Sequence, residues 1–364
     1  MDGYDVVVCA DCGFCFADHI PPQPIFDVYY REMSKYEIQN DLGQVSKYDF
    51  ERLSLIASHL MKFIPKPDSQ ILEIGCSTGT LLSILKNNGF SNVVGADPSP
   101  ACAQAADRLY GIKVFPNALS DMVIEDESIE VMILVGVLEH IRDLDVVLQK
   151  CWKMLAHQGL LYIVVPDASR YFEGDDAPFQ EFSVEHINFF GPDSLSNLMV
   201  RNGYSRFAVQ QGMVIANYRT TTPVIYGVYQ KKQPANQPAI LPDKNTEQGL
   251  KQYIEQSMII DQQIKDKIAH LVASHKPIIV WGTGAHTLRL LNSSDLRTAE
   301  IRAFVDTNPK YHGKKLNGVQ IVSPEALKAW TDPILISSRN YQEEIAKQIR
   351  EELSINNPIV RLYP

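Results

Sequence analysis

The sequence predicts an α/β protein with two doubly wound units and a small hairpin module in front of them. Apolar runs alternate with helical patterns over residues 51–231 and again over residues 246–364. Each stretch contains a strand, a turn with glycines, a helix and a second strand that ends on an acid. A proline-rich, polar segment at 232–245 lies between them and is typical of a linker.

Composition and charge limit the class of protein. The chain has 364 residues, enough for two or three domains, and a net charge of −9 with no block of like charges. This balance is unfavourable for a nucleic-acid polymer as partner and for a polybasic membrane anchor. No apolar run is long enough to cross a bilayer, and the first residues lack the pattern of a signal peptide. Six scattered cysteines do not form a disulfide framework, so we expect a cytosolic location.

Residues 1–50 are expected to form the small N-terminal module. Two short apolar runs around a turn predict a hairpin, and a tyrosine-rich segment follows a proline-rich connection. Cys9 and Cys12 stand in a C-x-x-C-G pattern, which is one half of a zinc knuckle. A closed zinc site needs four ligands, and the sequence has no second C-x-x-C elsewhere along the chain. Zinc bound by Cys9 and Cys12 is one interpretation, and a hairpin with small buried thiols is the other.

Strands and helices are expected to alternate over residues 51–231. The fourth apolar run, 129–141, is apolar enough to be a strand buried on both faces, and the helical pattern of 144–159 stops at Gly159. The expected helices are 51–64, 81–90 and 144–159, and the expected strands lie in 71–74, 93–97, 111–119, 129–141, 160–167, 210–219 and 224–232.

The second unit repeats the opening of the first. After a long amphipathic helix at 247–275, a strand leads into a turn with Gly282 and Gly284, and the next strand ends at Asp306. The remaining pattern predicts strands within 318–327, 332–338 and 358–364 and a helix at 341–353. Two nucleotide-type units are therefore expected in one chain.

The glycine turn of the first unit indicates which nucleoside it binds. A dinucleotide fingerprint has a central glycine that lets backbone amides approach a pyrophosphate, but this chain has Ser77 between Gly75 and Gly79. The carboxylate of Glu73 would repel a pyrophosphate and would attract a cation. S-adenosylmethionine carries a sulfonium and an ammonium group and no phosphate. Asp97, at the end of the second strand, is placed to accept hydrogen bonds from ribose hydroxyls.

The pattern E-x-G-x-x-x-G followed by an acid resembles the class I S-adenosylmethionine-dependent methyltransferases. The resemblance implies that a loop after the third strand contacts the adenine and that the segment VLEH, ending at His140, lies under the methionine end. His140 then either touches the substrate or is structural. The residues that this resemblance assigns to the cofactor are Glu73, Gly75, Cys76, Gly79, Asp97, Pro98, Ala118 and Leu119.

Glu185 and His186 are the strongest catalytic candidates. An acid next to an imidazole, flanked by aromatic residues, is what a sheltered general base needs, because an imidazole titrates near neutrality. Methyl transfer is an in-line displacement, so alignment and removal of the acceptor's proton are the tasks left to the protein. The alternative is a polar loop before a helix that begins near Pro192.

Over nearly its whole length the chain resembles the sugar methyltransferases that act on nucleotide-linked deoxysugars. The matching pieces are C-x-x-C-G, Y-Y-x-x-M-S-x-Y-E, E-x-G-x-x-x-G, EHINFF and VDTNPKYHGKKLNGVQIVSPE. The resemblance implies an N-terminal zinc module, a Rossmann-like class I methyltransferase sheet and a second, C-terminal Rossmann-like α/β domain. It implies His186 as base with Glu185 beside it, and Tyr30 and Tyr36 at the cofactor or acceptor site. For the nucleotide-sugar it implies Gly282, Gly284 and Lys310.

Two departures from that family leave the acceptor atom open. The first C-x-x-C of the zinc module is missing, and Ser183 stands where carbon-methylating relatives tend to carry a tyrosine. Carbon methylation needs a stabilised enolate, so O- or N-methylation of another small molecule stays an alternative. A non-catalytic, nucleotide-binding partner subunit is a further alternative, although a scaffold has no need of Glu73, Asp97 and His186 together.

Overall fold

A computed structural model describes residues 4–32, 45–119, 122, 124–215, 220–232 and 240–363. The chain forms two compact units: Met1–Asp175 with Glu181–Tyr253, and Asp176–Gln180 with Ile254–Pro364. The division falls inside helix α8 (Asn245–Val272) rather than in the expected linker at 232–245.

The first unit is built on a seven-stranded sheet with strand order β5-β4-β3-β6-β7-β10-β9. The strands from β5 to β7 run parallel, and β10 is antiparallel to both of its neighbours. The strand order reverses at β3, and a ligand crevice is expected beyond the carboxyl ends of the strands at such a point. The strands are β3 (Ile71–Ile74), β4 (Val93–Ala96), β5 (Val114–Phe115), β6 (Ile129–Val135), β7 (Leu155–Pro166), β9 (Tyr204–Ile215) and β10 (Thr221–Lys231).

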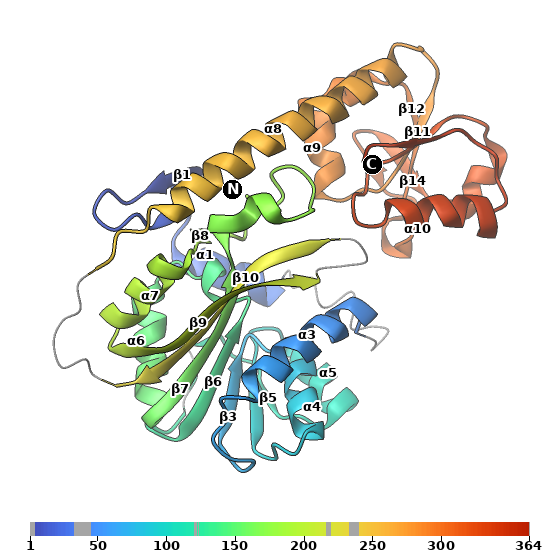
Figure 1. The fold of residues 1–364 in the computed structure, drawn as a ribbon. Helices are drawn as coiled ribbons and strands as arrows, with labels where there is room; N and C mark the ends of the chain where they lie inside the picture. Colours follow the sequence, from blue (N-terminus) through green and yellow to red (C-terminus); the bar gives the residue numbers. More distant parts are fainter. Residues whose placement is uncertain are drawn as a thin grey trace. The chain divides into compact units, whose positions relative to one another are not determined.

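Helices cover both faces of this sheet (Figure 1). They are α3 (Lys47–Leu60), α4 (Thr80–Asn87) and α5 (Pro100–Tyr110) on one face, and α6 (Leu144–Met154) and α7 (Pro192–Arg201) on the other. Alternate strand residues therefore enter different cores: Leu72 packs with α6 and α7, whereas Ile71 packs with α3 and α4. Burial of each such side chain stabilises the fold by about 2 kcal/mol.

Two helices of this unit differ from the sequence prediction at their ends. Helix α3 begins at Lys47 because the hydroxyl of Ser46 accepts a hydrogen bond from the backbone N–H of Asp49 at 3.0 Å. Helix α6 ends at Met154 rather than near Gly159, and the chain continues directly into β7. The cause is Leu155, which pairs with β6 and is fully buried in the sheet core.

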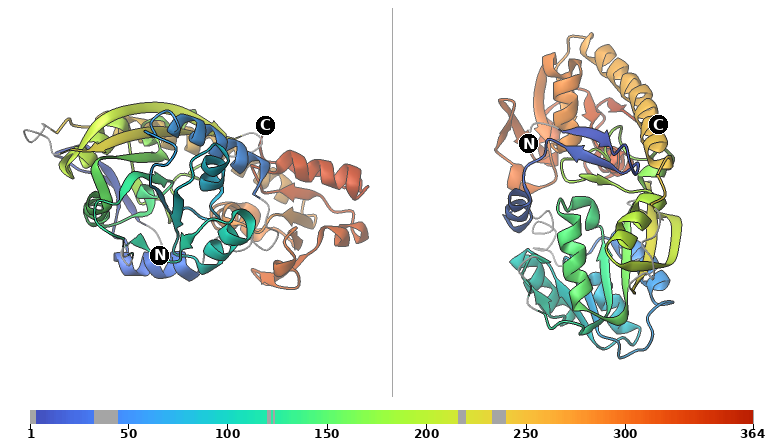
Figure 2. Two further views of the ribbon diagram at one scale, coloured as in Figure 1. Left: turned by 90° about the horizontal axis from the view of Figure 1, so that it is seen from below. Right: turned by 90° about the vertical axis from the view of Figure 1, so that its left-hand side faces the viewer.

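The N-terminal hairpin joins the first unit through a separate small sheet. Its strands β1 (Asp5–Val8) and β2 (Cys15–Asp18) pair antiparallel, and β2 pairs in turn with β8 (Asn188–Phe189), beside which the hairpin lies in Figure 2. The Asn188 side chain donates hydrogen bonds to the backbone carbonyls of Leu138, the first residue of the short helix η2 (Leu138–His140), and of Ile141, which follows that helix. The hairpin, β8 and η2 are thereby fixed to one another. The other helices of this unit are α1 (Gln23–Glu32) and η3 (Ala168–Glu173).

The second unit contains a six-stranded sheet in the order β13-β14-β12-β11-β15-β16, in which only β13 is antiparallel. The order reverses at β11, as it does at β3 in the first unit. The strands are β11 (Ile278–Trp281), β12 (Ile301–Val305), β13 (Lys315–Leu316), β14 (Val319–Val322), β15 (Ile334–Ile336) and β16 (Ile359–Arg361). The helices after α8 are α9 (Ala285–Ser293), η4 (Asp295–Thr298), η5 (Pro309–Tyr311), η6 (Pro324–Ala329), α10 (Gln342–Lys347) and η7 (Gln348–Glu352).

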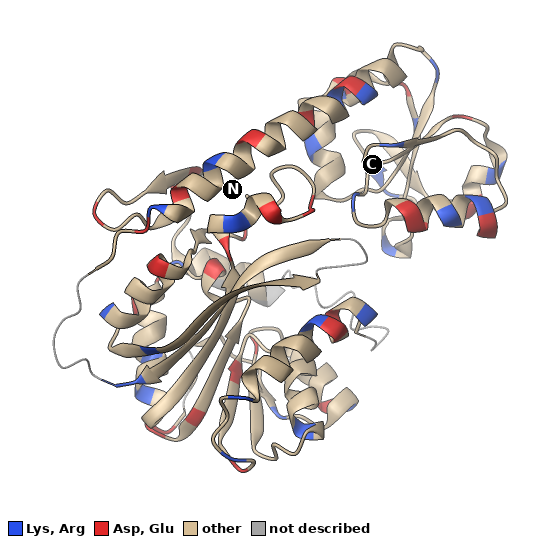
Figure 3. Cartoon of the chain, in the orientation of Figure 1, with Lys and Arg blue, Asp and Glu red and all other residues tan. Residues whose placement is uncertain are grey.

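Charged side chains of both signs are interspersed over the helices, as along α8 and α10 in Figure 3. Within the described residues, no helix is long and apolar enough to span a membrane.

Candidate active site

The turn after β3 is shaped by residues with left-handed backbone conformations. Gly75, Ser77 and Gly79 have φ values of 69°, 48° and 76°. The N–H of Gly75 donates to the carbonyl of Ala96 at 2.8 Å, which fixes the turn to the end of β4. A Cβ on Gly75 would lie 2.8 Å from a methyl group of Val137, so a side chain there would be strained twice over.

Asp97 holds this turn from the next strand. Its Oδ2 accepts a hydrogen bond from the N–H of Ser77 at 2.9 Å, and its Oδ1 accepts one from the N–H of Ser99 at 3.0 Å. Burial raises the pKa of Asp97, while these two backbone donors oppose that shift. Each carboxylate oxygen keeps a further lone pair, so the carboxylate can still accept hydrogen bonds from a ligand.

Glu73 is a buried carboxyl group that lacks a counter-charge. Its side chain is 4% exposed, and among the described residues its Oε2 has no hydrogen-bond partner. Burial, and secondarily the charge of Asp97, raise the pKa of Glu73 to about 8. A cation beside it would relieve both effects, because it would favour the ionised carboxylate.

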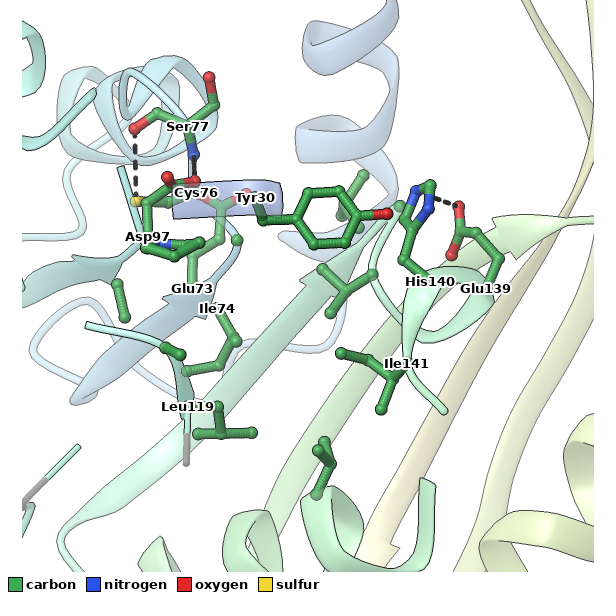
Figure 4. Close-up of a pocket in the computed structure, with 18 of the residues that line it drawn as sticks. Tyr30, Glu73, Ile74, Cys76, Ser77, Asp97, Leu119, Glu139, His140 and Ile141 are labelled. Atoms are coloured by element: carbon green, nitrogen blue, oxygen red, sulfur yellow. Dashed lines mark hydrogen bonds and ion pairs between the residues drawn. The ribbon is translucent and has the colours of Figure 1, made fainter. Parts of the chain in front are cut away.

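A cavity of about 660 Å³ opens over the turn and extends along the ends of β3, β4 and β6. Figure 4 shows Glu73 and Asp97 at one end of it and His140 at the other. The residues predicted to bind the cofactor that line this cavity are Glu73, Gly75, Cys76, Asp97, Pro98, Ala118 and Leu119. Gly79 does not line it and instead caps α4, and Tyr36 lies outside the described residues.

The far end of the cavity is lined by polar and aromatic side chains from three segments. Tyr29 and Tyr30 come from α1, Glu139 and His140 from η2, and Glu185 from the segment before β8. The hydroxyl of Tyr29 donates to Glu185 Oε1 at 2.7 Å. In Figure 4 the ring of Tyr30 extends across the cavity with its hydroxyl toward His140. A second molecule, which receives a group from a ligand bound over the turn, would bind at this end of the cavity.

His140 has one ring nitrogen engaged. Its Nδ1 lies 2.8 Å from the carbonyl oxygen of Glu185, to which it donates when that nitrogen carries the proton. Its Nε2 lies 3.9 Å from Glu139 Oε1, a pair marked in Figure 4. Burial lowers the pKa of His140, and the charge of Glu139 only partly opposes this shift, so the neutral imidazole is favoured.

His186 lies behind His140, and it is not among the residues that line the cavity. The two imidazole rings have centroids 5.0 Å apart. Nδ1 of His186 is 3.7 Å from Glu181 Oε2, and it is buried without a hydrogen-bond partner in the described part of the chain. Burial lowers the pKa of His186, but the nearby carboxylates of Glu181 and Glu139 outweigh it and the pKa is raised.

Three residues near His140, His186 and Glu185 were not predicted as site residues from the sequence. Glu139 was named only as part of the VLEH segment, and Glu181 and Tyr29 were not named. The glutamate of VLEH could have been recognised from the sequence. It follows a strand predicted to be buried on both faces, and an acidic side chain is rarely buried unless it is paired. Tyr29 gave no such signal, since its proximity to the histidines is tertiary, and Glu181 gave none because it stands in an irregular segment five residues before His186, where no periodic pattern indicates which side chains meet.

The second unit has a cavity of its own, also of about 660 Å³, beyond the ends of β11, β12 and β15. Gly282 and Gly284 line it as expected residues of the turn, and Asp306 lines it from the end of β12. Lys310 is exposed and does not line it. Its charged lining consists of Asp306, Glu344 and Glu352, with no lysine or arginine among the described residues that form it. An acidic lining suits sugar hydroxyls better than phosphate.

The cysteine turn supplies two accessible thiols. Cys9 and Cys12 are half-buried and free, whereas Cys15 is fully buried among the aromatic residues of its own core. Hydrogen bonds from the backbone N–H groups of Cys12 and Asp11 lower the pKa of Cys9. The described residues therefore offer two of the four ligands that a closed structural zinc site needs.

Comparisons with known proteins agree with this geometry. A family model described as a methyltransferase domain matches residues 47–208, which include the glycine turn, both acids of the cavity and η2. The class I methyltransferase fold is present, with its parallel-sheet core, and a further sheet domain follows it. Residues 47–208 therefore match a methyltransferase domain in sequence and have its fold. A second model, described as C2185-like, N-terminal, matches residues 274–360.

Individual proteins are similar to part of this chain. A probable S-adenosylmethionine-dependent methyltransferase of Mycobacterium tuberculosis is 23% identical over 160 residues, 44% of this chain and 57% of that protein. A ubiquinone biosynthesis O-methyltransferase of Chelativorans is 33% identical over 100 residues, 26% of this chain and 39% of that protein. A solved structure of geranyl diphosphate C-methyltransferase from Streptomyces coelicolor is 12% identical with a TM-score of 0.44, over 58% of this chain and 98% of that one. The chain thus spans about half the length of the curated relatives it matches.

Proposed function

We propose that the protein is an S-adenosylmethionine-dependent methyltransferase that acts on a sugar or a nucleotide-sugar. The observation that carries the cofactor assignment is the pair of buried carboxylates, Glu73 and Asp97, in the cavity of the first unit. Glu73 would be held ionised by a cationic ligand, and Asp97 would accept hydrogen bonds from ribose hydroxyls. When bound, S-adenosylmethionine supplies an electrophilic methyl group on a sulfonium.

The acceptor is proposed to lie at the end lined by Tyr30, His140 and Glu185. During transfer a bond forms between the acceptor atom and the methyl carbon, and the sulfur–carbon bond breaks with its electron pair going to sulfur. The acceptor's proton then needs a base, and we assign that role to His186, with His140 between His186 and the cavity. The aromatic rings of Tyr29 and Tyr30 help to exclude water.

The nucleotide-sugar is proposed because of the second α/β unit. Its cavity lies at the reversal point of a parallel sheet, and Asp306 stands at the end of the strand next to the glycine turn. An acid in that position suits ribose hydroxyls. The acceptor atom is left open: relatives named ubiquinone biosynthesis O-methyltransferases favour oxygen as the alternative, with another small-molecule acceptor.

The test is a methyl-transfer screen with radiolabelled S-adenosylmethionine against keto and hydroxyl forms of nucleoside-diphosphate sugars. We expect label in at least one of them and none in free nucleotides. Label in a phenolic or amine acceptor instead would overturn the sugar assignment while keeping the methyltransferase. Absence of transfer to all acceptor classes, with cofactor binding intact, would favour the non-catalytic partner subunit.

Two further expectations from the sequence remain proposals. A cytosolic location is one of them. Zinc on Cys9 and Cys12 is the other, and it would need ligands beyond the two thiols of this turn. Metal analysis of the natural protein and of the double variant Cys9→Ser/Cys12→Ser tests it, and equal zinc content in both would exclude the thiols as ligands.

A further inference from the structure

We propose that Glu139, His140 and His186 form a binding site for a divalent transition-metal ion. Each of the three side chains offers one ligand atom, and these atoms all lie within 4.8 Å of one another. All three residues belong to the first compact unit, and two of them line its cavity. The site lies at the acceptor end and is separate from the cysteine turn.

The carboxylate of Glu139 is the first independent observation. The residue is 3% exposed, and within the described chain its Oε2 has no hydrogen-bond partner. Burial of an unpartnered carboxylate oxygen is costly, and such an atom in a folded protein calls for a bound ion, water or strain as its explanation. A cation between Glu139 and the imidazoles supplies that partner.

The two imidazoles are the second observation, because each has a carbonyl or carboxylate behind it. His140 has the carbonyl of Glu185 at 2.8 Å from Nδ1, which leaves Nε2 with a lone pair on the side of Glu139. His186 has the carboxylate of Glu181 3.7 Å from its own Nδ1. In metal-binding histidines the second ring nitrogen typically donates to an oxygen that fixes the tautomer; His140 has this contact, whereas the Glu181 oxygen lies beyond hydrogen-bond distance of His186 Nδ1.

The donor set indicates which ions bind. Two neutral imidazoles with one carboxylate suit Zn²⁺, Fe²⁺, Co²⁺ or Mn²⁺, whereas Mg²⁺ and Ca²⁺ prefer sites made of oxygen. Three protein ligands leave at least one coordination position open, as in catalytic rather than structural sites. That position would be reached from the cavity of the first unit, since Glu139 and His140 line it.

The metal and the acceptor's proton compete for the same atoms. This consequence, unlike the binding itself, rests on the proposed function. A lone pair of His186 that is bonded to a metal cannot take a proton, so the ion-bound protein is expected to be the inactive form. Addition of Zn²⁺ should therefore lower the rate of methyl transfer and release protons on binding.

The binding test uses Co²⁺ as a spectroscopic probe and Zn²⁺ as its competitor. The full-length protein carries Cys9→Ser and Cys12→Ser, so that thiolates do not contribute. Titration with Co²⁺ should give visible d–d bands at one equivalent, without sulfur charge-transfer bands, and Zn²⁺ should remove them. No saturable band in this protein would overturn the proposal, whatever the outcome of the acceptor screen.

Substitutions locate the site. Glu139→Gln should weaken Co²⁺ binding by roughly 100-fold or more, and Glu181→Gln by roughly 10-fold to 100-fold through the orientation of His186. The matched control is Glu185→Gln, which removes a neighbouring carboxylate that is not one of the three ligands and should change the affinity only a few-fold. Undiminished binding in both Glu139→Gln and His186→Gln would overturn the assignment. Thermal unfolding of each variant verifies that it is folded.

Discussion

The two α/β units have the same backbone arrangement at their glycine turns, but they differ in one side chain on the strand that leads into the turn. In both, the N–H of the first turn glycine donates to the last residue of the neighbouring strand at 2.8 Å: Gly75 to Ala96, and Gly282 to Val305. In both, an acid at the end of that strand binds a residue of the turn, Asp97 in the first unit and Asp306 in the second. The shared geometry of the two turns therefore does not by itself decide which ligand each unit binds.

The difference lies two residues before the glycine. The first unit has Glu73 there, buried with an unpartnered oxygen, and the second has Val280, fully buried in an apolar core. A cationic ligand is favoured only by the first. The second cavity instead has carboxylates from α10 and η7 on its rim, far along the chain from its turn. If both turns bind a ligand, we expect the strand residue before the turn to decide its charge.

The largest effect should separate His186, which lies next to His140 in the first unit, from His286, which lines the cavity of the second unit. We expect His186→Ala to lower turnover by roughly 10²-fold to 10⁴-fold, because a general base contributes about that factor, with unchanged affinity for S-adenosylmethionine. His286→Ala removes the imidazole of the second cavity, which lies 2.6 Å from the hydroxyl of Tyr363, and should leave kcat within a few-fold. Steady-state kinetics measure both. Equal loss in the two variants would remove His186 from the chemistry.

The acids of the two units should affect different ligands. Asp97→Asn is expected to weaken S-adenosylmethionine binding by roughly 10-fold to 100-fold, since hydrogen bonds to a charged group are worth about 1.5–3 kcal/mol. Asp306→Asn should leave that affinity unchanged and raise KM for a nucleotide-sugar. Calorimetry measures the first effect and kinetics the second. Unchanged cofactor binding in Asp97→Asn would refute the placement of the cofactor.

The ionisation of Glu73 should make the stability of the ligand-free protein depend on pH. Its pKa in the folded, ligand-free protein is about 8, against an ordinary value of 4.5, so the unfolded chain binds fewer protons in between. Stability from this group is therefore lost as the pH rises from about 4.5 to 8. Glu73→Gln removes that loss, and we expect the ligand-free variant to be more stable at pH 9 by a few kcal/mol.

The same substitution should weaken cofactor binding. The cation is favoured by ionised Glu73, so affinity in the natural protein gains a component that rises through pH 8, and Glu73→Gln should lack it. The difference between the two pH profiles isolates this component from titration of the cofactor's own amino group. Denaturant unfolding and calorimetry, each at several pH values, make the comparison. Parallel profiles would mean that Glu73 is protonated in the complex.

The smallest effects should come from the turn glycines. Gly75→Ser places a side chain at φ 69° and against Val137, and should destabilise the fold by about 1–3 kcal/mol. Gly284→Ser has open space around the new Cβ and an ordinary φ, so stability should change by less than about 0.5 kcal/mol. Denaturant midpoints compare the two. A cost at Gly284 equal to that at Gly75 would contradict the assigned backbone.

Local pattern predicted the fold well, and it predicted the cofactor end of the site better than the acceptor end. The strands β3, β4 and β6 and their turn arise from contiguous residues, so Glu73 and Asp97 could be placed from spacing alone. The end of α6 was mistaken because Leu155 obeys a sheet contact that the helical period of its own segment does not contain. Glu181 approaches His186 through an irregular segment whose course no periodic pattern predicts, and Lys310 does not line the cavity at the turn for which it was predicted.

The pairing of β2 with β8 has a consequence for how the protein assembles. The cofactor end needs only neighbouring strand–helix units, whose contacts close short loops and form early. The acceptor end needs the N-terminal hairpin to meet a segment far along the chain, as in the hydrogen bond from the hydroxyl of Tyr4 to the carbonyl of Ser183, 179 residues away. During refolding, recovery of cofactor binding is therefore expected to precede recovery of methyl transfer.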